Sequence, residues 1–396
     1  MKEYDLILVL TTFRRVMVYL PIIKELSSRY KIGLYVVPMS EKEKAKTGET
    51  DRHFVDLCCK LGAEIVEGCP VKSRFSLVPQ WPYTDQEMRG IRERIHCEKY
   101  FVVVGLMWGN VHLGRMGGIP IDKYLVIDVD LYRYRLEKRE KEKDYPIDPE
   151  DLVEVGLPFA RYPVFEDMGL DYMIAHPSPL SLPEAKDKCK YLECLLSLVS
   201  EIDPRDRIVL KPHNGNERYD YVVNERWFRL LTNSVLYPMH SLILWAAERL
   251  MGWVKAVDFS VSRRIQDGLY DVMTAIHYKK LLERVVPFSR LTPYHNFSLE
   301  LFLPLVKKGL ITGRSNTIWH ALYVKLPIYN CVDKNTIVEN TDKMNYYSMQ
   351  YFEVPYCAGH LVFDKKYFGI IREEVREKNL IEYLTILLRA EDKQKT

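Results

Sequence analysis

Short apolar runs alternate with amphipathic helical patterns in this chain, and the alternation occurs twice. In the first third, apolar runs at residues 6–10 and 32–37 alternate with helical patterns at 16–26 and 54–61. Such alternation is typical of parallel sheets, because each helix carries the chain back to the start of the next strand. A second series begins near Asp171. The sequence therefore predicts an α/β fold with two Rossmann-like lobes.

Composition agrees with two domains and excludes some partners. A chain of 396 residues, of which 47% are hydrophobic, is longer than one ordinary core accommodates and fits two domains. Lysine and arginine total 57 against 54 acidic residues, and a net charge of +3 gives no reason to expect nucleic acid as a partner. The first apolar run is too short for a signal peptide, so we expect a cytoplasmic protein, with peripheral attachment at the inner face of the membrane left open.

Cysteine spacing gives no sign of covalent or metal cross-links. The eight cysteines include no CxxC pair and no secretory context accompanies them, so we expect neither disulfides nor structural zinc.

Domain boundaries follow from the spacing of the strands. We expect an acceptor-binding lobe over residues 1–165 and a nucleotide-donor lobe over 166–370. The last helix, at 371–396, is expected to pack across both lobes. Almost a hundred residues separate His213 from the strand near Leu310, whereas one helix and strand need only ~30 to 40. The donor lobe therefore carries a helical insert.

The insert, at about residues 217–290, is rich in aromatic side chains, including Trp245 and Trp253. Its apolar run at 241–253 is too short to span a bilayer. Two interpretations remain for the 225–264 part: helices packed into the core, or an interfacial surface that contacts a membrane.

The strand IVLKPHN at residues 208–214 delivers cations to its carboxyl end. Lys211 and His213 alternate along it, so both side chains point to one side, with Asn214 next in the chain. Charge-assisted contacts to phosphate suit this arrangement. The alternative is that His213 only caps the junction between strand and loop.

A second strand end in the same lobe also suits an anion. The strand near Leu310 breaks at Gly313, and Arg314 adds a cation. Ser315, Asn316 and Thr317 follow where a helix would begin, and they offer side-chain oxygens and unpaired backbone N–H groups. Two such strand ends predict a nucleotide diphosphate held between them.

The turn at residues 176–179 closes the first strand of this lobe. Ser178 is placed there to offer a hydroxyl to the nucleotide. A turn that is simply stiffened by its prolines is the alternative.

These residues resemble glycosyltransferases of the two-lobed GT-B fold, in particular bacterial capsule and surface-polysaccharide transferases. The resemblance lies in Lys211–His213, matching a Lys-x-His donor-phosphate motif, and in the later Ser/Thr-rich turn. Asn214 stands where that family usually has proline, and His320 stands where many members have a glutamate that holds the donor ribose. The resemblance implies that His320 lies at the donor site and that the first lobe binds the acceptor.

An inverting reaction would need a general base from the first lobe. We select His112 and Asp130 at predicted strand ends; Asp128 shares a face with Asp130, and Arg14 and Arg15 are candidate acceptor contacts. No DxD motif occurs in a loop suited to Mg²⁺, so we expect a metal-independent reaction without a cofactor.

The sequence thus indicates a glycosyltransferase that moves a sugar from a CMP- or UDP-linked donor to a surface glycan or a lipid-linked acceptor. Three alternatives stay open. They are a CDP-polyol phosphotransferase of the teichoic-acid type, a sugar-nucleotide 2-epimerase, and a noncatalytic partner subunit with the same fold.

Overall fold

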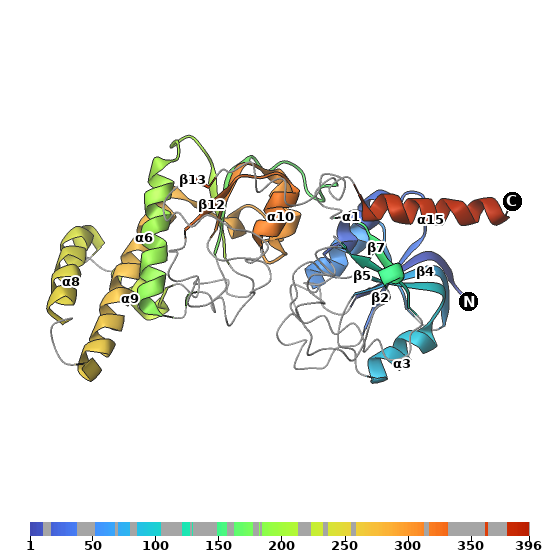
Figure 1. Cartoon of the computed structure of the whole chain (residues 1–396), viewed down its shortest axis with the longest axis horizontal. Coiled ribbons are helices and arrows are strands. Elements are labelled where there is room, and N and C mark those ends of the chain that lie inside the picture. The colour runs from blue at the N-terminus through green and yellow to red at the C-terminus, as the bar shows by residue number, and fades with distance from the viewer. Residues whose placement is uncertain are drawn as a thin grey trace. The chain divides into compact units, whose positions relative to one another are not determined.

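In the computed structural model the chain divides into two compact units (Figure 1). Unit 1 comprises Met1–Glu166 and Gly369–Thr396, and unit 2 comprises Asp167–Phe368. Each unit contains its own sheet and its own buried core. The structure describes residues 1–10, 17–37, 52–67, 70–79, 85–103, 121–126, 129, 149–156, 162–176, 182, 184–212, 223–232, 237–254, 259–312, 317–331, 361–362 and 378–395.

Within its described residues, unit 1 forms a sheet with the order β3-β2-β1-β4-β5-β6-β7, and all paired strands are parallel. Chain order reverses between β1 and β4, which makes their carboxyl ends the switch point of this sheet. The elements are β1 (Glu3–Leu10), α1 (Tyr19–Leu26), β2 (Ile32–Val36), β3 (Glu64–Ile65), β4 (Val71–Pro79), α3 (Asp85–Arg94), β5 (Ile95–Val103), β6 (Ile121–Val126), η3 (Pro149–Asp151) and β7 (Leu152–Glu154).

The central strands of unit 1 are buried on both faces. Leu6 to Leu10 are all almost inaccessible, as expected for a continuous apolar run inside a parallel sheet. At the switch point, the Tyr19 hydroxyl of α1 lies 3.1 Å from the Val9 carbonyl and 3.0 Å from the Leu77 carbonyl, and it shares its proton between them. Complete burial raises the pKa of Tyr19, so this hydroxyl stays protonated and joins α1 to β1 and β4.

Unit 2 has the strand order β10-β9-β8-β11-β12-β13 in its described part. All pairs are parallel except β12 with β13. Renumbered along the chain, this is the 3-2-1-4-5-6 order of dinucleotide-binding sheets, with its switch point between β8 and β11. The predicted α/β fold with two Rossmann-like lobes is therefore confirmed. The strands are β8 (Leu170–Ala175), β9 (Ile208–Lys211), β10 (Val286–Pro287), β11 (Val306–Thr312), β12 (Ile328–Asn330) and β13 (Leu361–Val362).

The described residues between β9 and β10 include the helices α7, α8 and α9, which fall within the range expected for the insert. The longest, α9 (Phe259–Arg284), packs against α6 (Ala185–Glu201), and α8 (His240–Val254) contacts α9 (Figure 1). The other helices of unit 2 are α7 (Glu225–Thr232), η5 (Tyr237–Met239), η6 (Phe288–Arg290), η7 (Leu299–Leu301), η8 (Leu303–Leu305) and α10 (Thr317–Tyr323). In the described part of the chain, no helix is both long enough and apolar enough to cross a bilayer.

The last helix, α15 (Leu380–Lys395), belongs to unit 1 and contacts α1. The Arg74 side chain of β4 donates a hydrogen bond of 2.6 Å to the Leu388 carbonyl. The Phe101 ring of β5 lies edge-on to Tyr383, with 6.4 Å between centroids. The chain thus returns from unit 2 to complete the core of unit 1.

Candidate functional site

Three neighbouring strands of unit 2 end at the same edge of the sheet. Ala175 of β8 pairs with Lys211 of β9 on one side and with Thr312 of β11 on the other. The Thr312 hydroxyl donates to the Ala175 carbonyl at 2.9 Å, and the His176 N–H donates to the Lys211 carbonyl at 3.4 Å. Lys211, His176 and Thr312 therefore meet at the switch point, where ligands bind in open α/β sheets.

Lys211 places a cation inside this edge. It is 3% exposed, and its Nζ donates to the His295 carbonyl at 2.8 Å. The same Nζ lies 5.7 Å from the centroid of the Phe288 ring. A buried ammonium group requires partners of this kind, because desolvation disfavours its charge. The carbonyl of His295 uses one of the three N–H donors of the ammonium group.

His176, which directly follows β8, is also buried, at 2% exposed. Its Nδ1 lies 3.0 Å from the Tyr191 hydroxyl of α6, and its ring packs near those of Tyr191 and Tyr278. From the sequence, His176 was expected only to begin a turn. The pairing register shows that it belongs to the cluster at the switch point.

A carboxylate and an imidazole lie close together in unit 2. His320 of α10 is buried, and its Nδ1 lies 3.6 Å from Oε1 of Glu300 in η7. The sequence predicted His320 only from its resemblance to glycosyltransferases, many of which have a glutamate at this position. Glu300 was not identified, because it lies in an ordinary-looking LEL segment with no local motif. The fold nevertheless brings an acidic group to His320.

Of the predicted donor-site residues, Lys211, Thr317 and His320 are described. Lys211 ends β9 at the switch point, and Thr317 begins α10, the helix that follows β11. The remaining candidates lie outside the described residues and stay predictions. In unit 2 these are Ser178, His213, Asn214, Gly313, Arg314, Ser315 and Asn316, and in unit 1 they are His112 and Asp130, together with Arg14, Arg15 and Asp128.

Comparisons with known proteins return structures only. No family model and no curated protein matches the chain. It is similar to a Listeria monocytogenes protein assigned as a UDP-N-acetylglucosamine 2-epimerase, with 9% identity, a TM-score of 0.43, and coverage of 99% of this chain and 97% of that one. S. aureus MnaA, solved with UDP, is 9% identical, with a TM-score of 0.40 and coverage of 96% of this chain and 92% of that one. The calicheamicin glycosyltransferase CalG4 is 10% identical, with a TM-score of 0.40 and coverage of 100% of this chain and 98% of that one. Because these scores are low, the two Rossmann-like units are assigned from their strand orders.

Proposed function

We propose that this chain is a glycosyltransferase that moves a sugar from a CMP- or UDP-linked donor to a surface glycan or lipid-linked acceptor. The observation that carries the proposal is the cluster at the switch point of unit 2. There Lys211, His176 and Thr312 end three adjacent strands, and a buried cation stands at the edge where a nucleotide would bind. Unit 1 would bind the acceptor.

In this proposal, the carboxyl edge of the sheet of unit 2 stabilises the leaving group of the reaction. As the bond to the sugar breaks, negative charge develops on the departing phosphate. A fixed cation in a site from which water is excluded lowers the barrier for this step. Lys211, supported by His213 in the adjoining segment, would supply that charge without a metal ion. A base from unit 1, with His112 and Asp130 as candidates, would remove the proton from the acceptor hydroxyl.

The experiment that tests the donor site is calorimetric titration of the full chain with CMP, CDP, UDP and GDP. Selective binding of a cytidine or uridine nucleotide supports the proposal and identifies the donor class. If none of the four binds, the donor site is wrong. Phosphodiester in the product of a later assay with CDP-polyol would instead indicate the phosphotransferase alternative.

One observation favours a second candidate, a sugar-nucleotide 2-epimerase. The Glu300–His320 pair provides a carboxylate and an imidazole, 3.6 Å apart, in the same unit as the proposed nucleotide site. Groups of these types transfer protons in such isomerisations. Incubating the protein with UDP-N-acetylglucosamine alone in D₂O separates the two activities. A 2-epimerase that abstracts a carbon-bound proton incorporates solvent deuterium into the sugar, whereas a glycosyltransferase leaves it unlabelled without an acceptor.

We further propose that α8 brings the enzyme to a membrane surface, where a lipid-linked acceptor would lie. Its buried face, formed by Ala247, Met251 and Val254, packs inward. The opposite face exposes Leu242, Trp245, Leu250 and Trp253, of which Trp253 is 71% exposed. Arg249 lies over the Trp245 ring at 5.4 Å, so a cation accompanies the apolar face. This combination suits a helix lying in the interface.

Replacing Trp245 and Trp253 together with glutamate is expected to weaken binding to vesicles of phosphatidylglycerol and phosphatidylethanolamine by more than about tenfold, because each tryptophan contributes buried apolar area. Vesicle co-sedimentation measures the effect. Ile386→Glu on α15, where the parent side chain is 66% exposed, is the matched control and should leave binding unchanged. Equal binding by the double variant and the wild type would contradict a membrane role for α8.

A further inference from the structure

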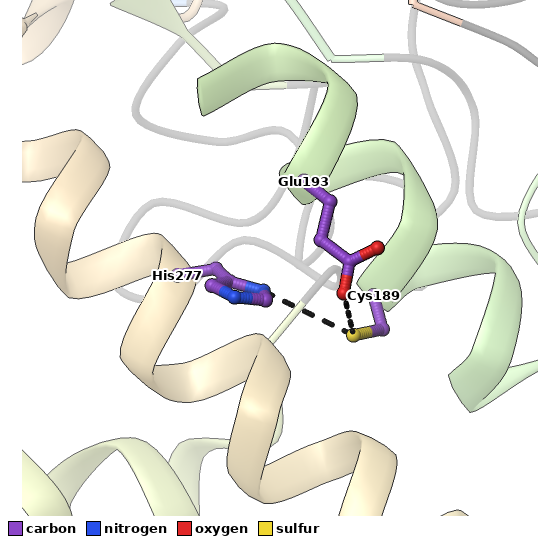
Figure 2. Close-up of side chains that lie close together, drawn as sticks. All are labelled: Cys189, Glu193 and His277. Atoms are coloured by element: carbon purple, nitrogen blue, oxygen red, sulfur yellow. Dashed lines mark hydrogen bonds between the residues drawn. The ribbon is translucent and has the colours of Figure 1, made fainter. Parts of the chain in front are cut away.

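Three side chains of types that can bind a metal ion lie close together between α6 and α9 (Figure 2). They are Cys189, Glu193 and His277. Cys189 and Glu193 are one turn apart on α6, so both side chains project from the same face of that helix. His277 points toward them from α9 and is separated from Cys189 by 88 residues of chain. We propose that these three residues form a binding site for Zn²⁺ or a similar divalent transition-metal ion.

The two distances that involve the Cys189 sulfur are close to those of a tetrahedral site. Cys189 Sγ lies 3.5 Å from Glu193 Oε1 and 3.9 Å from His277 Nδ1, and all three ligand atoms lie within 4.8 Å of one another. With Zn–S at about 2.3 Å and Zn–N or Zn–O at about 2.0 Å, tetrahedral angles place such atoms about 3.5 Å apart. An ion at the centre of this triangle would therefore require only small movements of the side chains.

The donor set suits a borderline-soft cation. Thiolate, imidazole and carboxylate are the three ligand types that zinc uses in proteins. Burial, assisted by the charge of Lys280, lowers the pKa of His277 to about 4. A neutral imidazole is the form of histidine that binds a metal ion.

The Cys189 thiol, in contrast to the imidazole, is protonated when no ion is bound. Burial, followed by the charge of Glu193, raises the pKa of Cys189, so without an ion the thiol keeps its proton and donates toward Glu193. Binding Zn²⁺ would replace that proton: the S–H bond breaks, an S–Zn bond forms, and one H⁺ leaves to solvent. Glu248 of α8 also acts on Cys189 and adds negative charge to the surroundings.

An ion can reach this site from solvent. Cys189 is buried, His277 is intermediate and Glu193 is exposed, so the cluster extends from the core to the surface of unit 2. The exposed side leaves a fourth coordination position for water. The site lies between α6 and α9, and none of its three ligands belongs to the proposed nucleotide site.

A bound ion would also fix the insert in place. Cys189 packs in a small apolar cluster with Ala247 of α8 and Met273 of α9. Coordination by α6 and α9 would cross-link the two helices that hold α8. The inferred role is therefore structural: the metal ion stabilises the packing of α6 and α9, the helices against which α8 and its exposed tryptophans are held.

Metal binding by the intact chain, freed of metal with a chelator, tests the proposal. Co²⁺ alone is titrated and the thiolate-to-cobalt charge-transfer band is followed, and Zn²⁺ affinity is measured by competition with a chromophoric chelator. We expect one ion per chain. Cys189→Ser should remove the band and weaken Zn²⁺ binding by about 100-fold, because each of only three protein ligands contributes a large share of the binding free energy. His277→Gln should weaken Zn²⁺ binding similarly while keeping the band.

The matched control is Cys59→Ser, which removes an exposed thiol in unit 1 and should change neither readout. If Cys189→Ser does not fold, Glu193→Gln gives the decision, because this exposed side chain can be changed without repacking, and it should also weaken Zn²⁺ binding. A charge-transfer band that survives Cys189→Ser or disappears in Cys59→Ser would overturn the proposal. Unchanged Zn²⁺ affinity in Glu193→Gln would do the same.

Discussion

Replacing Lys211 with methionine is expected to weaken binding of the preferred nucleoside diphosphate by about 10- to 100-fold, because a charge-assisted hydrogen bond contributes about 1.5–3 kcal/mol. Lys211 ends β9 at the switch point of unit 2, and its side chain is almost fully buried. Methionine keeps most of the volume and removes the charge. Isothermal calorimetry on the variant and the wild type measures the change.

Lys308→Met is the matched control for this experiment. Lys308 lies near the amino end of β11 in the same sheet, is about half exposed, and pairs with Asp206 at 2.6 Å. Its replacement removes the same charge from the same unit at the opposite edge, so nucleotide affinity should stay within about twofold of wild type, because a surface ion pair contributes little. Equal losses in both variants would mean that only net charge matters, and the assignment of Lys211 to the site would be wrong.

The Lys211 variant also carries a stability effect that must be separated from binding. Its Nζ donates to the His295 carbonyl, and leaving that acceptor unmatched costs about 1–3 kcal/mol. Thermal unfolding without nucleotide measures this loss. Calorimetry is therefore performed well below the unfolding temperature of the variant, where any remaining deficit in affinity belongs to the site.

The strands that build the site were predictable from sequence because they are buried on both faces. The segments at 208–210 and 310–311 are apolar and buried, and polar groups follow at their carboxyl ends. β10 was not predicted, because two residues, Val286 and Pro287, give no periodic signal. The order of strands in each sheet was also out of reach, since pairing depends on contacts between distant parts of the chain.

The contacts that define the candidate sites show the same limit. Lys211 was predicted because a cation at a strand end is a local signal. Glu300 opposite His320 and His277 opposite Cys189 were not, because each pair forms only when separate helices pack together. Cysteine spacing argued against zinc through the lack of a CxxC pair. A site built from one cysteine, a glutamate one turn away and a distant histidine carries no such motif.

The second large effect is expected on the stability of unit 1, where the last helix, α15, is attached. Arg74→Met is expected to destabilise unit 1 by about 3 kcal/mol, because it breaks a partly buried ion pair and leaves the buried Leu388 carbonyl without this donor. The Arg74 side chain is 9% exposed, donates to Asp5 at 3.2 Å and donates to the Leu388 carbonyl of α15 at 2.6 Å. One side chain therefore holds the last helix against β4 and β1.

Hydrogen exchange resolved along the chain measures the effect where it occurs, since two units need not unfold in a single transition. In Arg74→Met, amides of α15 and β1 should exchange about 100-fold faster, as a loss of about 3 kcal/mol predicts, while β8 to β11 keep their protection. Lys72→Met, on the same strand but exposed, is the control and should change little. If α15 keeps its protection without Arg74, the helix is held by its apolar face alone. The contacts of Leu384 and Leu388, both fully buried, would then account for the return of the chain.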